Sequence, residues 1–297
     1  MDVTARCVPF LPATEQRERI IMRIAAPGAR TSAAASAGRL AVKVPEITAL
    51  FWVVKILTTG MGETFSDFLV SHLNPGLALG SGAIAFTVAL IAQFRTDRYR
   101  IWIYWSAVTM VAIFGTMVAD ALTYLAGLPY LVTTAGCLIV LAVVFVWWHA
   151  KEKTLDVHSI TTPRRERFYW TMVMTTFVLG TVAGDLTADL LHLGYLGSTV
   201  VFAIAIAVPA AAHRWAGLGT VAAFWSAYII TRPLGASITD WLSQSRHDGL
   251  NLGTGWISLG ATIVIVALLG LLTTRGDRPA AGLRSDAVRP GEADASL

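Results

Sequence analysis

The amino-acid sequence predicts an all-α integral membrane protein. We expect eight transmembrane helices, arranged as four parallel helical-hairpin repeats, with both termini cytoplasmic. Three observations predict this: sparse charge, eight long apolar segments and a motif that occurs four times. Of the 297 residues, 55% are apolar and only 14% are charged, whereas soluble proteins carry roughly 25% charged residues.

The apolar segments are each close to the roughly 20 residues that cross about 30 Å of hydrocarbon. Backbone groups in lipid must be hydrogen-bonded within the segment, so each segment is predicted to be a helix. The segments cover residues 47–70, 76–94, 101–125, 129–148, 168–192, 195–212, 218–242 and 252–272. Short breaks rich in Gly and Pro, at 74–76 and 127–129, predict tight hairpins.

The repeated motif is an aromatic residue, then Trp, then Gly ten residues after the Trp, then Asp five residues later. These offsets are identical in all four copies, whose Trp residues lie 53, 65 and 55 residues apart. Such internal repeats indicate one unit of structure used four times. The motif residues are Trp52, Trp105, Trp170 and Trp225; Gly62, Gly115, Gly180 and Gly235; and Asp67, Asp120, Asp185 and Asp240.

Basic residues predict the orientation in the membrane. Arg246 is the one basic residue in the loops of one side. Sixteen Lys and Arg residues lie on the other: Arg30, Arg39, Lys43, Arg95, Arg98, Arg100, Lys151, Lys153, Arg164, Arg165, Arg167, Arg214, Arg275, Arg278, Arg284 and Arg289. Positive charge favours the cytoplasmic side, so the net charge of +4 indicates topology and not nucleic-acid binding.

The domain organisation follows from these segments. Residues 1–43 are predicted to be a disordered basic cytoplasmic tail, with seven Lys and Arg against three acidic residues, and translation from Met22 would shorten it. Residues 44–273 form the transmembrane domain, with repeats at about 44–95, 98–149, 164–214 and 218–273. Residues 274–297 are predicted to be a second disordered cytoplasmic tail.

Charged residues within the apolar segments occur only in the first helix of each hairpin. They are Lys55, Glu63, Asp67, Asp120, Asp185, Asp189, Arg232 and Asp240. A charge inside a membrane costs at least about 2.5 kcal/mol, so it normally faces a bundle interior or an aqueous cavity. The first helices are therefore predicted to line the interior.

Positions 1, 4, 8, 11 and 15 after each Trp fall on one stripe of a helix. The stripe begins with a hydroxyl at Ser106, Thr171 and Ser226, and it ends with the motif Asp. We therefore predict a polar face that presents a carboxylate at the same depth four times. The candidate ion or proton sites are Asp67, Asp120, Asp185 and Asp240, assisted by Glu63, with Lys55, Arg232 and Asp189 as supporting charges.

Structural interpretations stand beside the functional one. The Trp residues could form an interfacial aromatic belt, and the Gly residues are expected to be packing notches. The Asp residues could be structural, and Lys55 and Arg232 could neutralise carboxylates in a buried ion-pair network. His72, His192 and His247 could join a metal site, although loop histidines are usually solvated. Pro233 favours local unwinding beside Arg232.

The sequence resembles a bacterial family of membrane-anchored proteins built from four tandem copies of a repeat of unknown function. The resemblance rests on Lys43-Val-Pro-Glu46, on Phe51-Trp52 with Lys55, and on Gly62-Glu63 with Asp67. It covers about residues 43–273, and the long N-terminal tail departs from it. It implies the architecture and a location in the bacterial inner membrane, and it brings no established activity, substrate or catalytic residue. No cofactor is predicted.

The leading functional hypothesis is a small transporter or channel-like permease for a cation or protons. The rival is a non-transporting membrane anchor or sensor subunit that docks a cytoplasmic partner. The basic segment 149–167 would be its contact with the partner or with lipid headgroups. An intramembrane enzyme is the weakest interpretation, because no HExxH, GxSxG, CxxC or phosphate-loop motif occurs. The partners implied are the lipid bilayer and a small cation or proton.

Overall fold

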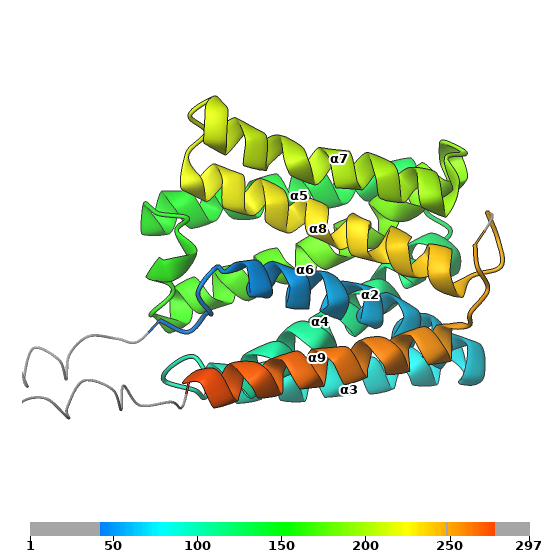
Figure 1. Ribbon diagram of the computed structural model, residues 1–297, viewed down its shortest axis with the longest axis horizontal. Helices are drawn as coiled ribbons and strands as arrows, with labels where there is room; N and C mark the ends of the chain where they lie inside the picture. The colour runs from blue at the N-terminus through cyan, green and yellow to red at the C-terminus, as the bar shows by residue number, and fades with distance from the viewer. Residues whose placement is uncertain (1–41, 248, 277–297) are drawn as a thin grey trace, which may run out of the picture. The chain divides into compact units, whose positions relative to one another are not determined.

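A computed structural model describes residues 42–276 except 248, and these residues form eight long α-helices and no strand (Figure 1). The first helices of the hairpins, called the motif helices, are α2 (Ala49–His72), α4 (Ile101–Asp120), α6 (Pro163–Asp185) and α8 (Thr220–Ser243). The returning helices are α3 (Pro75–Phe94), α5 (Tyr130–Glu152), α7 (Gly194–Trp215) and α9 (Thr254–Gly276). The predicted all-α class is confirmed, and each of the eight predicted segments contains one long helix.

Local sequence explains where several helices begin. The Thr48 hydroxyl accepts a hydrogen bond from the backbone N–H of Phe51 at the start of α2, and Thr162 caps α6 in the same way. Pro75 and Pro163 occupy the first turn of α3 and α6, where a proline costs no intrahelical hydrogen bond.

Six helices are long and apolar enough to cross a membrane: α3, α5, α7 and α9, and α4 and α6 together with the turns that follow them. The chain is therefore a multi-pass membrane protein by length and composition. The other two helices, α2 and α8, have 24 residues each and carry charged residues away from their ends, among them Lys55 and Arg232.

The four motif helices form a closed ring in which α2 packs against α4, α4 against α6, α6 against α8, and α8 against α2. Each returning helix packs mainly on the motif helix of the next repeat and not on its own. Thus α3 lies on α4, α5 on α6, α7 on α8, and α9 closes the cycle on α2, as Figure 1 shows for α9 and α2. The repeats are interlocked, so no hairpin packs as an isolated unit.

The motif glycines lie where neighbouring motif helices touch. A Cβ at Gly115 would come 2.8 Å from Cβ of Phe177, and one at Gly235 would come 2.7 Å from Cγ2 of Thr59. Gly62 meets Ala112 and Gly180 meets Arg232 in the same way. In every case the partner is the residue seven positions after the next Trp. The interpretation of the glycines as packing notches is confirmed.

The motif aromatics form a second closed cycle. The aromatic residue before each Trp contacts the Trp of the next repeat, with ring centroids 5.7–6.3 Å apart in the pairs Phe51–Trp105, Tyr104–Trp170, Tyr169–Trp225 and Phe224–Trp52. Trp105, Trp170 and Trp225 are only 3–4% exposed. The alternative of an interfacial aromatic belt is therefore wrong for these three Trp residues. Their indole groups fill the interior of the helix ring and do not face lipid headgroups.

The motif helices begin at one end of the ring, the basic end, and their Asp residues lie at the other, the carboxylate end (left and right in Figure 1). At the basic end Lys43 Nζ lies 2.7 Å from Glu166 Oε2, and Gln93 donates to Glu166 Oε1. The fold thus includes Val42 and Lys43, two residues ahead of the predicted boundary. Burial raises the pKa of neighbouring Tyr99 to about 12. The rest of the predicted N-terminal tail, and the C-terminal one beyond 276, lie outside the described residues.

Candidate functional site

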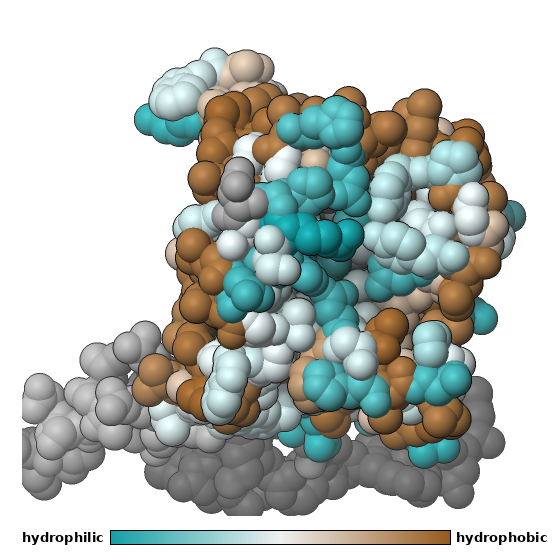
Figure 2. All heavy atoms as spheres, turned by 90° about the vertical axis from the view of Figure 1, so that its right-hand side faces the viewer, coloured by the Kyte–Doolittle hydropathy of each residue, from teal (hydrophilic) through white to brown (hydrophobic). Residues whose placement is uncertain are grey.

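A cavity of about 410 Å³ opens at the carboxylate end of the ring. Figure 2 looks onto this end and shows hydrophilic side chains gathered around a central hollow, with hydrophobic side chains at the margin. All four motif carboxylates line the cavity together with Glu63: they are Asp67, Asp120, Asp185 and Asp240. The structure therefore brings together every residue predicted as a carboxylate site.

These carboxylates differ in their partners. Asp67 accepts a hydrogen bond of 2.7 Å from Gln244 Nε2. The carboxyl groups of Asp120, Asp185 and Asp240 have no hydrogen bond or ion pair with any other residue in the described part of the chain, although Asp240 is only 8% exposed. Asp120 and Asp185 are half-buried, and burying a carboxylate without a partner is costly, so no contact seen here makes these three groups stabilising.

Two of the Asp residues are followed by a single π-helical turn, Ala121–Leu125 after Asp120 and Leu186–Leu190 after Asp185. Such turns are rare and are found mostly at functional sites. The second turn carries Asp189, which bonds His247 Nε2 at 2.7 Å and accepts from the Tyr130 hydroxyl at 3.2 Å. Asp189 is therefore a paired residue, and it does not line the cavity.

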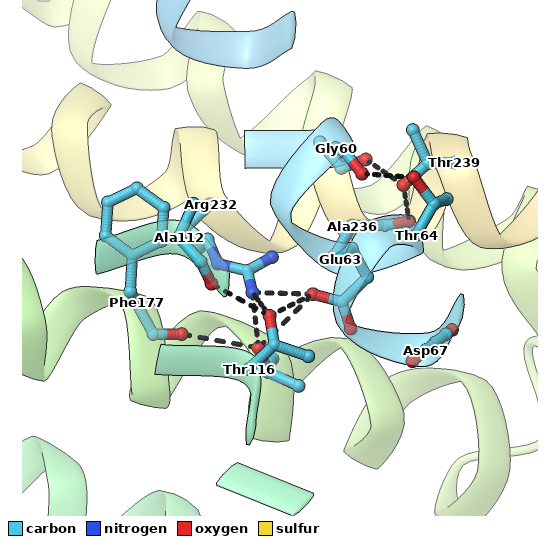
Figure 3. Close-up of polar contacts among 12 residues, drawn as sticks. Gly60, Glu63, Thr64, Asp67, Ala112, Thr116, Phe177, Arg232, Ala236 and Thr239 are labelled. Carbon is cyan, nitrogen blue, oxygen red and sulfur yellow. Dashed lines mark hydrogen bonds and ion pairs between the residues drawn. The ribbon is translucent and has the colours of Figure 1, made fainter. Parts of the chain in front are cut away.

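Arg232 lies behind the cavity lining, where it is bonded to Glu63. Its Nη2 donates to Glu63 Oε2 at 2.5 Å and to the hydroxyls of Thr116 and Thr181 at 2.5 and 2.6 Å. Figure 3 shows Arg232 and Thr116 facing Glu63, with Asp67 farther along α2. Arg232 is fully buried. The interpretation of Arg232 as the partner of a buried carboxylate is confirmed for Glu63.

The three oxygen-bearing partners of Arg232 occupy one position of the repeat. Glu63, Thr116 and Thr181 each lie eleven residues after their Trp. The fourth repeat has Ala236 at this position, and it contributes Arg232 instead, one turn earlier. A single guanidinium therefore joins all four motif helices at one level.

Lys55 is also fully buried in the ring. Its Nζ lies 3.8 Å from the centroid of the Tyr228 ring and 5.1 Å from that of Phe177, and it has no hydrogen-bond partner among the residues described. Cation–π contact of this kind stabilises a desolvated ammonium by about 2 kcal/mol. Lys55 does not neutralise a carboxylate here, unlike Arg232.

Aromatic side chains separate this level from the basic end. The hydroxyls of Tyr104 and Tyr169 are 2.5 Å apart, and both side chains are buried. Together with the aromatic cycle described above they fill the ring between Arg232 and the basic end. The cavity is therefore closed on that side.

The predicted polar stripe holds only in part. Positions 11 and 15 face the ring interior, but Ser106 and Thr171 at position 1 are exposed, and Val53 at the same position is 47% exposed. Position 1 lies about 80° around the helix from position 11, because ten residues at 100° fall 80° short of three turns. The hydroxyls at this position consequently point out of the ring.

The three histidines near the carboxylate end do not gather into a metal site. His72 Nδ1 lies 2.8 Å from the carbonyl oxygen of Phe68, and His247 is bonded to Asp189. Within residues 42–276, leaving out 248, no three His, Cys, Asp or Glu side chains are close enough to hold a metal ion.

Sequence reasoning did not single out Tyr228 and Phe177, the aromatic partners of Lys55. Phe177 lies seven residues after its Trp, the position of Arg232 in its own repeat. The signal was available in the alignment of the repeats, because positions 7 and 11 are one turn apart and face the same axis.

Comparison with known proteins is consistent with this internal symmetry. The family described as "Repeat of Unknown Function (DUF347)" matches the chain four times, at residues 50–99, 103–154, 168–218 and 223–276. The four matches cover more than half of the chain and coincide with the four hairpins. No curated protein and no solved structure matches the chain.

Proposed function

Because the chain belongs to the family of the Repeat of Unknown Function (DUF347), whose description assigns no activity, we propose a function from the site itself. The protein is a permease for a cation or protons in a bacterial inner membrane, and it is not an enzyme. All eight helices span the bilayer, and both termini are cytoplasmic. The path begins in the cavity at Asp67, Asp120, Asp185 and Asp240.

The observation that carries the proposal is the set of three carboxylates without partners in one cavity. A carboxylate kept for stability normally has a hydrogen-bond donor or a cation beside it. In the low dielectric of a membrane interior, unpaired carboxylates attract cations or bind protons, and such residues commonly mark ion pathways and proton relays. Asp120, Asp185 and Asp240 fit this role because they face the same space from three helices.

Arg232 and Glu63 form the gate in this proposal. A cation or proton that reaches Glu63 competes with Arg232 for the same carboxylate oxygen. Arg232 precedes Pro233, which removes one backbone hydrogen bond inside α8. The expected unwinding at Pro233 does not occur, because α8 is one helix from Thr220 to Ser243. The missing bond still weakens α8 next to the residue that has to move, and movement of Arg232 would extend the cavity past Glu63.

The proposal is favoured over the docking alternative by the packing of the basic loop. Val157 and Ile160 are buried, and the carbonyl oxygen of Leu155 accepts a hydrogen bond from Trp225 Nε1. The loop is thus held against the ring by contacts of its own. Replacing the exposed Lys151 and Lys153 with Gln, which keeps this packing, discriminates between the functions: a permease keeps its flux, whereas a docking protein loses its partner.

The test is cation flux into liposomes that contain the purified full-length protein. Internal pH and cation-sensitive dyes report flux under an imposed gradient. The variant Asp120→Asn/Asp185→Asn/Asp240→Asn is expected to fold and to reduce flux at least tenfold. Asp97→Asn, the same change in an exposed loop at the basic end, serves as the matched control and is expected to retain wild-type flux.

Two outcomes would contradict the proposal. The first is wild-type flux in the triple variant, which would remove the carboxylates from the path. The second is an absence of flux for protons and for monovalent and divalent cations in a well-folded wild type. That result would favour the anchor or sensor function.

A further inference from the structure

A second hollow lies at the basic end, on the outer side of the ring between α5 and α6. Its volume is about 390 Å³. It shares no residue with the cavity at the carboxylate end. The residues that line this groove are Val144, Trp147 and Lys151 of α5 and Arg164, Arg167, Phe168 and Thr171 of α6.

The groove carries positive charge that the protein leaves uncompensated. Glu152 forms ion pairs with Arg164 and Arg165. Lys151 and Arg167 are exposed and have no ion-pair partner within the part of the chain that the structure describes. Both project from the ends of the two helices into the same groove.

The remainder of the groove is apolar. Trp147 is 57% exposed, and its ring lies edge-on against Phe168 with centroids 5.4 Å apart. Val144 precedes Lys151 by seven residues, about 10 Å farther along the helix, and it forms the buried floor of the groove, at 7% exposure. Val144 and Trp147 belong to a helix that is long and apolar enough to cross a membrane. The groove therefore leads from unpaired cations directly onto a surface suited to hydrocarbon.

We propose that this groove binds one anionic phospholipid. The headgroup phosphate is bound by Lys151 and Arg167, and the upper part of an acyl chain lies along the exposed face of Trp147. Juxtamembrane basic residues attract anionic lipids, and the apolar wall distinguishes a lipid from a free phosphate. The α3–α4 loop carries Arg95 and Arg98, which are exposed but do not line this groove. The proposal is independent of ion transport.

The experiment is native mass spectrometry of the full-length protein in a neutral detergent, titrated with phosphatidylglycerol or phosphatidylcholine. Wild type is expected to bind one phosphatidylglycerol in preference to phosphatidylcholine. Lys151→Gln/Arg167→Gln is expected to weaken that binding about 30-fold, because each basic residue contributes about 1 kcal/mol near an anionic surface. Arg95→Gln/Arg98→Gln removes the same charge elsewhere at the basic end and is expected to change binding less than twofold.

Two further measurements separate a lipid from other anions. Trp147→Ala is expected to weaken phosphatidylglycerol binding several-fold while the basic residues remain, and millimolar glycerol phosphate is expected not to displace the lipid. Equal binding of both phospholipids, or equal losses in the two double variants, would overturn the proposal. Displacement by glycerol phosphate would overturn it in favour of a free anion.

Discussion

At the basic end of the ring, the buried carboxylate of Glu166 is bonded to both Lys43 and Gln93. At the carboxylate end, Asp120, Asp185 and Asp240 share a cavity, and their carboxyl groups have no partner within the part of the chain that the structure describes. The same chemical group is thus structural in one place and left available in the other. The two ends therefore differ in pairing: Glu166 is held by a cation and an amide, whereas the three Asp carboxyl groups have no such contact.

Arg232 lies between the two ends, and its replacement is expected to have the largest effect. Arg232→Met leaves Glu63 buried with only two threonine hydroxyls, and removal of one partner of a buried ion pair costs about 3–5 kcal/mol. Denaturant unfolding in detergent measures the loss. The double variant Arg232→Met/Glu63→Gln is the control and is expected to regain most of the stability. Equal losses in the single and double variants would show that Glu63 does not depend on Arg232.

One variant at each end tests directly whether the carboxylates of the two ends differ in their contribution to stability. Lys43→Met removes the cation from Glu166 and is expected to cost about 3 kcal/mol. Asp120→Asn, which removes a charge that has no partner, is expected to change stability by less than about 0.5 kcal/mol or to raise it. Unfolding measurements on both variants decide the matter. A large loss for Asp120→Asn would mean that the carboxylate end is as structural as the basic end.

The helix contacts that hold the ring together are expected to have an intermediate effect. A Cβ at Gly62 would collide with Ala112, including its backbone, so Gly62→Ala is expected to destabilise the fold by about 1–3 kcal/mol. Gly136 in α5 has open space around it, and Gly136→Ala is expected to be neutral or to stabilise by up to about 1 kcal/mol. Thermal unfolding of the two variants is the measurement, and similar losses in both would contradict the packing role.

The fixed spacing of Trp, Gly and Asp in the repeats explains how much of the fold and of the candidate site could be predicted from the sequence. The helices, the four hairpins and the common level of the Asp residues followed from fixed spacing and apolar length. The transport role of the carboxylates stays a prediction. The packing of each returning helix on the next repeat was not predicted, because a lipid-facing apolar pattern is the same whichever neighbour the helix contacts.

The contact of Arg232 with Thr116 and Thr181 was not predicted either. This contact joins the residue seven positions after the Trp of one repeat to residues eleven positions after the Trp of two other repeats. A comparison of equivalent positions among the repeats does not reveal such a pair. The outward direction of Ser106 and Thr171 was missed for a related reason. A stripe defined over fifteen residues drifts around the helix, and its first member had already left the interior face.

The smallest change in stability is expected when a hydroxyl is removed from one of two tyrosine pairs. Tyr104 and Tyr169 share a hydrogen bond between buried hydroxyls near the basic end, so Tyr104→Phe is expected to cost about 1 kcal/mol. Tyr124 and Tyr130 share one of 2.9 Å at the exposed carboxylate end. Water can replace the lost partner there, so Tyr124→Phe is expected to cost about 0–0.5 kcal/mol. Denaturant unfolding of both variants tests the difference. A larger loss at Tyr124 would mean that the carboxylate end is drier and more tightly built than its cavity indicates.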